Sequence, residues 1–171
     1  MTRYPKLLSK GAHHSVIALS ETEVGKIFDD DARAEIGSEA EKMKFANRVN
    51  GLVVRFIRLE ALNEAEMLVM ERLYPMDFRA IEVEKRELYL DVFEDELRQL
   101  HESGFVHRDL ARPSSAPGEK YDNIFLTARG LRLIDVGISA LKTQVGEALF
   151  SRFVEQERKE LEEFKTYFLE R

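Results

Sequence analysis

The stretch from Gly104 to Gly137 limits most strongly what this chain can fold into. The preceding residues 87–102 are spaced as a helix, and Gly104 is well placed as its C-terminal cap. Two short apolar runs, residues 124–126 and 131–134, flank a turn and predict a hairpin. Polar motifs occupy the connections: His107-Arg108-Asp109-Leu110 after the helix, Asp122-Asn123 before the hairpin, and Asp135-Val136-Gly137 after it.

Elsewhere the apolar pattern predicts an α+β chain whose strands are concentrated in its first half. Strands are predicted at residues 16–19, 24–28, 52–57 and 67–70, and the run at 52–57 is also compatible with a buried helical piece. Helical spacing covers residues 32–47, 87–102 and 145–169. The positions expected to be buried are Ile36, Ala40 and Met43 on the first helix, Leu90, Phe93, Leu97 and Leu100 on the second, and Leu149, Phe153, Leu161, Phe164 and Phe168 on the third.

Composition excludes several classes of protein. A formal net charge of -6 argues against a general nucleic-acid binder, which usually has a basic excess. The chain has no cysteine, so thiolate catalysis, disulfides and cysteine-ligated metals are excluded. No apolar run approaches the roughly 18 residues that a membrane span needs. A cytoplasmic protein without a membrane span is therefore expected.

Taken together, the polar motifs resemble those of protein kinases. In that family a catalytic Asp, a metal-binding Asn, a hairpin and a metal-binding Asp follow one another in this order. The resemblance implies a bilobal protein-kinase-like fold, with residues 1–74 as a strand-rich N-lobe and residues 75–171 as a strongly truncated helical C-lobe. It implies that Asp109 orients the acceptor hydroxyl and takes its proton. Asn123 and Asp135 would bind Mg²⁺ through oxygen atoms, which suit this hard cation.

The strand-rich part supplies the residues that the resemblance assigns to ATP phosphates. Lys26 lies in the middle of the strand predicted at residues 24–28, where kinases have a lysine for the α- and β-phosphates. Glu39 is the first choice for its partner on the helix, and Glu35 is the second. The run of residues 39–46 also resembles the corresponding helix of small atypical kinases. The alternatives are an ordinary edge-strand lysine and a solvated helix glutamate.

The resemblance extends to the adenine and to the phosphate loop. Residues 67–73 resemble the fifth strand and hinge, so Met70 would be the gatekeeper, and the backbones of Glu71 and Leu73 would meet the adenine edge. Gly11 and Ser15 would hold phosphate through backbone N–H groups and a hydroxyl. Their segment has one glycine where conventional kinases have three, which is similar to the RIO-type kinases and the small kinase of the tRNA-threonylcarbamoyl machinery.

Two features depart from the conventional pattern. Asn123 follows Asp109 by 14 residues instead of five, so the connecting loop carries about nine extra residues, and Ser114 stands where the Asn would normally fall. Only 34 residues follow Gly137, which leaves no room for the usual substrate-lobe helices. A protein partner that covers the truncated part is therefore a further expectation.

These features predict an ATP- and Mg²⁺-dependent phosphotransferase. An atypical Ser/Thr protein kinase is the first choice, acting on a protein hydroxyl or on its own Ser114, Ser115 or Thr143. A small-molecule or lipopolysaccharide-sugar kinase is the alternative among enzymes, because the short C-terminal part offers little surface for a peptide. Outside the enzymes, the competing interpretations are a pseudokinase that binds nucleotide without transfer and an interaction module without nucleotide.

The remaining polar residues have structural interpretations. His107 is expected to be a packed, hydrogen-bonded core histidine, and His13 and His14 are expected to be loop residues. Residues 155–163 are expected to form the solvated face of the last helix. Four arginines are expected to be scattered over the surface rather than gathered in a basic patch: Arg108, Arg112, Arg129 and Arg132.

Overall fold

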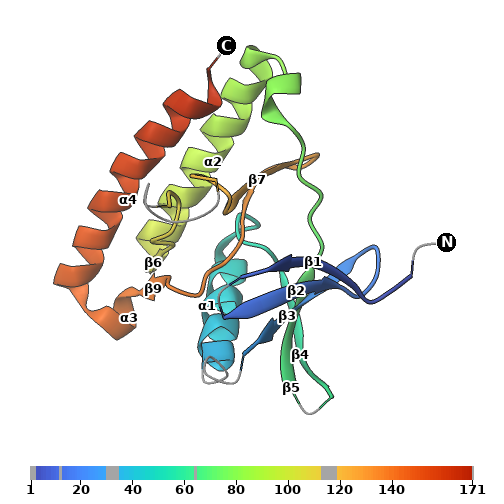
Figure 1. Cartoon of the computed structure of the whole chain (residues 1–171). Helices are drawn as coiled ribbons and strands as arrows, with labels where there is room; N and C mark the ends of the chain where they lie inside the picture. The colour runs from blue at the N-terminus through green and yellow to red at the C-terminus, as the bar shows by residue number, and fades with distance from the viewer. Residues whose placement is uncertain (1–2, 12, 30–34, 64, 113–118, 171) are drawn as a thin grey trace.

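The computed structural model describes residues 3–11, 13–29, 35–63, 65–112 and 119–170, which form an α+β arrangement. One region, here called the sheet region, contains a five-stranded antiparallel sheet and one long helix, α1 (Figure 1). The other, here called the helical region, contains two long helices, α2 and α4, and short strand pairs (Figure 1). The predicted α+β class is therefore confirmed.

The sheet region places Lys26 at its centre. The strand order is β1-β2-β3-β5-β4, and every neighbouring pair is antiparallel. Lys26 on β3 lies opposite Val16 on β2 and Leu68 on β5. The elements are β1 (Lys6–Lys10), β2 (His14–Ala18), β3 (Glu23–Phe28), α1 (Glu35–Val49), β4 (Phe56–Leu62) and β5 (Ala65–Glu71).

One predicted strand is shifted. The strand expected at residues 52–57 begins only at Phe56 and continues to Leu62. Leu52, Val53 and Val54 are buried, but they lie alongside β8 of the helical region and do not pair with β5. The apolar run therefore marks a buried connection between the two regions.

The helical region carries the polar motifs on short connections between its elements. These elements are η2 (Phe78–Ala80), α2 (Val83–Ser103), β6 (Phe105–Val106), β7 (Ile124–Thr127), β8 (Gly130–Leu133), β9 (Ala140–Leu141), α3 (Lys142–Val145) and α4 (Glu147–Phe168). Gly104 ends α2 in the left-handed conformation with φ of 100°, and β7 and β8 form the predicted hairpin. Thus the helix cap and the hairpin predicted around the motifs are both confirmed.

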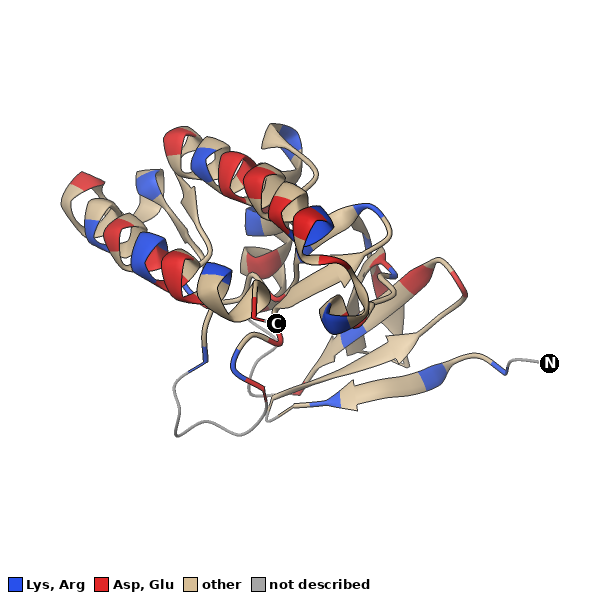
Figure 2. Cartoon of the chain, turned by 90° about the horizontal axis from the view of Figure 1, so that it is seen from above, with Lys and Arg blue, Asp and Glu red and all other residues tan. Residues whose placement is uncertain are grey.

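Helices α2 and α4 run side by side and antiparallel (Figures 1 and 2). Arg86 near the start of α2 donates from Nη1 to the carbonyl oxygens of Phe168 (2.6 Å) and Glu170 (2.9 Å), which ties down the end of α4. The outer surfaces of the long helices mix basic and acidic residues (Figure 2). No described helix combines the length and apolar character that crossing a bilayer requires.

The buried positions predicted for α2 are confirmed, whereas those predicted for α4 are confirmed only in part. Leu90, Phe93, Leu97 and Leu100 are all buried. On the last helix Leu149 is 42% exposed and Phe153 is only half-buried, and Phe150 and Val154 are buried instead. Gly146, with φ of 87°, separates α3 from α4, so the helical phase starts anew at Glu147.

Candidate functional site

Lys26 and Glu39 form a buried ion pair between β3 and α1. The side chain of Lys26 points out of the central strand, and its Nζ donates to Glu39 Oε1 at 2.8 Å. Lys26 is 5% exposed and Glu39 2% exposed, whereas Glu35 is exposed. Glu39 follows Ile36 and precedes Ala40 on the buried face of α1, which fixes its position. The edge-strand and solvated alternatives for these two residues are therefore wrong, and Glu39 rather than Glu35 pairs with Lys26.

Asp135 joins the pair from the helical region. Its Oδ1 lies 3.4 Å from Lys26 Nζ and accepts the N–H of Gly137 at 3.3 Å. Asp135 has φ of 53°, a left-handed conformation that is rare for residues other than glycine. Such backbone strain persists where the surroundings hold it, and it gathers at functional sites. The turn at Asp135 thus points a carboxylate back at the central strand of the sheet.

The charges of Lys26 and Asp135 stabilise each other, whereas at Glu39 burial outweighs the charge of Lys26 and raises the pKa of that carboxyl. Burial alone would lower the pKa of Lys26, but the carboxylates of Glu39 and Asp135 outweigh it and hold that pKa above its ordinary value. Burial alone would raise the pKa of Asp135, but Lys26 and the Gly137 N–H outweigh it, and that pKa is lowered. Lys26 and Asp135 are therefore both charged near neutral pH.

Asp109 and Asn123 meet despite the long loop between them. Asn123 Nδ2 donates to the backbone carbonyl oxygen of Asp109 (3.0 Å) and to its Oδ2 (2.9 Å). The extra residues do not separate them, because the Arg112 N–H donates to the Lys120 carbonyl oxygen at 2.7 Å and closes the base of the loop. The backbone carbonyl oxygen of Asn123 in turn accepts the N–H of Ile134, the residue before Asp135, at 3.0 Å.

The environments of Asp109 and Asp135 separate their acidities. Burial raises the pKa of the Asp109 carboxyl, and the negative charge of Asp135 adds to that rise. Asp135 instead has a lowered pKa because of Lys26 and Gly137. Two nearby carboxyls with pKa values shifted in opposite directions are suited to different roles, one exchanging a proton and one remaining an anion.

Glu157 on α4 holds the backbone of the loop that carries Asp109. Its carboxylate accepts the N–H of His107 (3.2 Å) and of Arg108 (2.8 Å), and its Oε2 lies 2.6 Å from His101 Nε2. Glu157 is 1% exposed, so the expectation that residues 155–163 form a solvated face is wrong at this position. Arg108 has φ of 72°, a left-handed conformation that Glu157 helps to fix.

His107 connects this loop to the turn at Asp135. Its ring is fully buried, as expected for a core histidine. Nδ1 accepts the Asp109 N–H at 3.2 Å, and Nε2 lies 2.8 Å from the Ile134 carbonyl oxygen. A neutral ring with its proton on Nε2 satisfies both contacts. His107 thus links the Asp109 and Asp135 segments through hydrogen bonds.

The remaining residues predicted to contact nucleotide lie on β2 and β5 or next to the ends of the strands. Gly11 forms a tight turn in which its N–H donates to the His14 carbonyl oxygen at 2.8 Å, and Ser15 is half-buried on β2 opposite Ile27. Met70 is buried on β5, and Glu71 and Leu73 are half-buried.

His14, expected in a loop, lies instead on β2, close to the charges of Lys26 and Asp135. Burial and the charge of Lys26 lower its pKa.

The donor set at Asn123 and Asp135 fits magnesium. Asp135 offers a carboxylate, and Asn123 uses Nδ2 for its hydrogen bonds to Asp109, which leaves the amide oxygen as a ligand atom. No group of three or more His, Asp or Glu side chains with a metal-holding arrangement occurs among the described residues. Magnesium commonly binds one or two carboxylates together with substrate phosphates, so two oxygen donors are suited to metal carried by a nucleotide.

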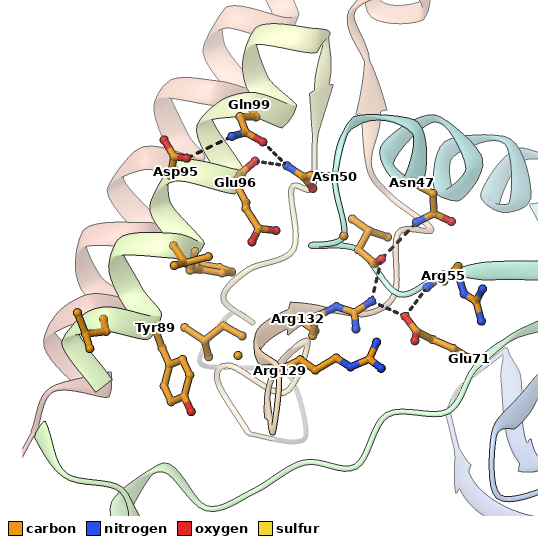
Figure 3. A pocket seen from close by; sticks show the side chains of 17 residues that line it. Asn47, Asn50, Arg55, Glu71, Tyr89, Asp95, Glu96, Gln99, Arg129 and Arg132 are labelled. Atoms are coloured by element: carbon orange, nitrogen blue, oxygen red, sulfur yellow. Dashed lines mark hydrogen bonds and ion pairs between the residues drawn. The ribbon is translucent and has the colours of Figure 1, made fainter. Parts of the chain in front are cut away.

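The site is distinct from a hollow of about 1220 Å³ between α2, the segment after α1, and the β7–β8 turn (Figure 3). None of Lys26, Asp109, Asn123 and Asp135 lines this hollow. Glu71 at the end of β5 and Arg132 on β8 do line it. The candidate site and the hollow therefore lie at separate places, and β5 and β8 connect them.

No protein-family model matches the chain, and no curated protein matches it significantly.

Proposed function

We propose that this chain is an ATP- and Mg²⁺-dependent phosphotransferase with a bilobal protein-kinase-like fold. Residues 1–74 would be the N-lobe, and residues 75–171 would supply the helical C-lobe. The observation that carries the proposal is the gathering of five residues from separate segments. Lys26 contacts both Glu39 and Asp135, and Asn123 contacts Asp109 beside them.

The sheet region would bind the nucleotide. Lys26, buried and charged, is suited to the α- and β-phosphates, and Glu39 holds its Nζ in place. Gly11 and Ser15 would contact phosphate from the β1–β2 turn. Backbone groups of Glu71 and Leu73, next to Met70, would contact the adenine.

The helical region would supply the metal ligands and the base. Bound Mg²⁺ would neutralise charge on the phosphate oxygens, held by Asp135 and the amide oxygen of Asn123. Asp109 would orient the acceptor hydroxyl and accept its proton as the new oxygen–phosphorus bond forms, while the bond from the γ-phosphorus to the β–γ bridging oxygen breaks and ADP leaves. The raised pKa of Asp109 supports this role, because a stronger base takes the proton more readily.

We propose a Ser/Thr hydroxyl of a protein as the acceptor, in the cytoplasm where ATP is available. Among the chain's own candidates, Thr143 is exposed on α3, whereas Ser114 and Ser115 lie outside the described residues. A small-molecule acceptor is the second candidate.

The test is transfer of label from γ-labelled ATP with Mg²⁺ to the chain itself, to cell-extract proteins and to extract small molecules. We expect label in one of these fractions and a loss of about 10²- to 10⁴-fold in Asp109→Asn, which keeps the shape of the side chain but removes the base. Thermal stabilisation by ATP without any transfer would contradict the proposal and indicate a pseudokinase. Absence of both at millimolar ATP would exclude nucleotide chemistry altogether.

A further inference from the structure

A partly buried ion pair joins the end of β5 to β8 on the wall of the hollow (Figure 3). Arg132 Nη2 donates to Glu71 Oε1 and lies 3.4 Å from the Val53 carbonyl oxygen. The same Glu71 Oε1 accepts the Arg55 N–H at 2.9 Å, and the Glu71 N–H donates to the Arg55 carbonyl oxygen at 3.0 Å. The side chains of Arg132 and Glu71 are 11% and 18% exposed. This pair therefore connects three segments of the chain.

Backbone hydrogen bonds surround the same junction. The Val54 N–H donates to the Leu133 carbonyl oxygen, and the Leu133 N–H donates to the Leu52 carbonyl oxygen, both at 2.8 Å. Asn47 on α1 donates from Nδ2 to the Val53 carbonyl oxygen at 3.2 Å. The segment between α1 and β4 is thus bonded to β8 on one side and to α1 on the other.

Each element at the junction leads to the candidate site. Helix α1 carries Glu39, β5 ends at the segment proposed to meet adenine, and β8 reaches Asp135 two residues after Leu133. A displacement of β8 against β5 would therefore change the contact between Asp135 and Lys26, which measures 3.4 Å. Close-packed interiors transmit strain, so a contact at the junction acts on the site.

Stability alone gives a poor reason for this pair. Burying two charges costs desolvation that their attraction repays only with complete hydrogen bonding. Arg132 Nε is buried without a hydrogen-bond partner among the described residues, which adds a further cost. The pair instead fixes the relative orientation of the segments that it joins, because a planar guanidinium meets the carboxylate and the Val53 carbonyl oxygen in a fixed geometry.

We propose that Arg132 and Glu71 are positioning residues, which hold β8 in a fixed position relative to the end of β5 so that Asp135 stays within reach of Lys26. This inference rests on the proposed function, since its consequence is seen in nucleotide and metal use. Arg132 and Glu71 would act on the site indirectly, because neither is among the residues assigned to ATP phosphates or Mg²⁺.

The test compares full-length wild type, Glu71→Gln, Arg132→Met and the double variant, with kcat and KM for ATP measured at saturating Mg²⁺. We expect each single variant to lower kcat/KM by about 3- to 30-fold. The double variant should be no worse than the worse single one, because both remove the same contact. Arg132→Lys, which keeps the charge, should recover part of the loss. Arg58→Met, which removes an exposed sheet ion pair with Glu23 at 3.0 Å, is the matched control and should stay within about twofold.

Nucleotide-induced thermal stabilisation of the wild type separates the two levels of failure. If the wild type binds ATP with Mg²⁺ and the variants lose unfolding free energy but keep kcat and KM, only the positioning role is overturned. Additive losses in the double variant, or a rise in kcat/KM in either single variant, also overturn it. If the wild type binds no nucleotide, the proposed function fails and this inference falls with it.

Discussion

The two regions each direct one buried helix carboxylate at the site, and the partners of these carboxylates differ. Glu39 on α1 is 2% exposed and meets a side-chain cation, Lys26 Nζ, at 2.8 Å. Glu157 on α4 is 1% exposed and meets two backbone N–H groups, those of His107 and Arg108, together with His101. Glu39 thus holds a charge in place, whereas Glu157 holds the shape of a loop.

The difference predicts different consequences of loss. Lys26 has a second partner in Asp135, so it is not left alone when Glu39 changes. The N–H groups of His107 and Arg108 have no such second acceptor among the described residues. Buried donors without acceptors are costly. We therefore expect Glu157 to matter mainly for folding and Glu39 mainly for the nucleotide.

The largest effect is expected for Glu157→Ala. Loss of three hydrogen bonds at a buried carboxylate should lower the free energy of unfolding by about 3–5 kcal/mol, measured by denaturant titration. Transfer activity should fall with it, because the Asp109 loop loses its backbone support. Glu155→Ala, an exposed change on the same helix, is the control and should be nearly neutral. A loss below about 1 kcal/mol in Glu157→Ala would remove the contrast between the regions.

A smaller effect on folding, with a clear effect on nucleotide, is expected for Glu39→Gln. The amide oxygen still accepts from Lys26, and Asp135 keeps the cation paired, so the free energy of unfolding should fall by only about 1–2 kcal/mol. Affinity for ATP with Mg²⁺, measured calorimetrically, should fall on the order of tenfold because Lys26 is held less firmly. Glu35→Gln on the same helix is the matched control. If Glu39→Gln destabilises the fold as much as Glu157→Ala does, the assignment of separate roles is wrong.

The smallest effect concerns the pH dependence of transfer. Asp109 accepts a proton only when ionised, and burial and Asp135 hold its pKa above the ordinary 3.8. The acid limb of kcat, measured at saturating ATP and Mg²⁺, should therefore lie at a higher pH than an ordinary aspartate would give. Asn123→Ala removes a hydrogen bond that favours the ionised form, so the acid limb should move to still higher pH. An acid limb at or below the ordinary value would exclude Asp109 as the base.

Local patterns in the sequence predicted much of this arrangement. The face of Leu90, Phe93, Leu97 and Leu100, the Gly104 cap and the β7–β8 hairpin depend on spacing and turn chemistry within one segment, and all three are confirmed. The pairing of Lys26 with a helix glutamate was implied by the resemblance to protein kinases, and the local pattern helped to select Glu39. Lys26 is a charge in an apolar strand, and Glu39 lies beside an apolar helix face.

What could not be predicted depends on contacts between distant segments. The apolar run at residues 52–54 is typical of a strand, yet in the structure it lies alongside β8. Val53 and Arg132, which meet there, are 79 residues apart in the sequence. The burial of Glu157 was not predicted, because its neighbours in the sequence are mostly charged. Its helical spacing with Val154, Leu161 and Phe164 on the buried face was the signal that would have found it. The meeting of Asn123 with Asp109 depends on closure of a long loop at Arg112 and Lys120, which spacing alone does not predict.

The most direct test is the affinity for ATP with and without Mg²⁺, measured by calorimetry on wild type and Asp135→Asn. Asp135 lies 109 residues from Lys26 and contacts it at 3.4 Å, so the two should act on one ligand. We predict that Mg²⁺ strengthens ATP binding to the wild type by about tenfold or more, and that Asp135→Asn abolishes this gain while the protein stays folded. The account is contradicted if the wild type binds no ATP, or if Asp135→Asn keeps the full Mg²⁺ dependence.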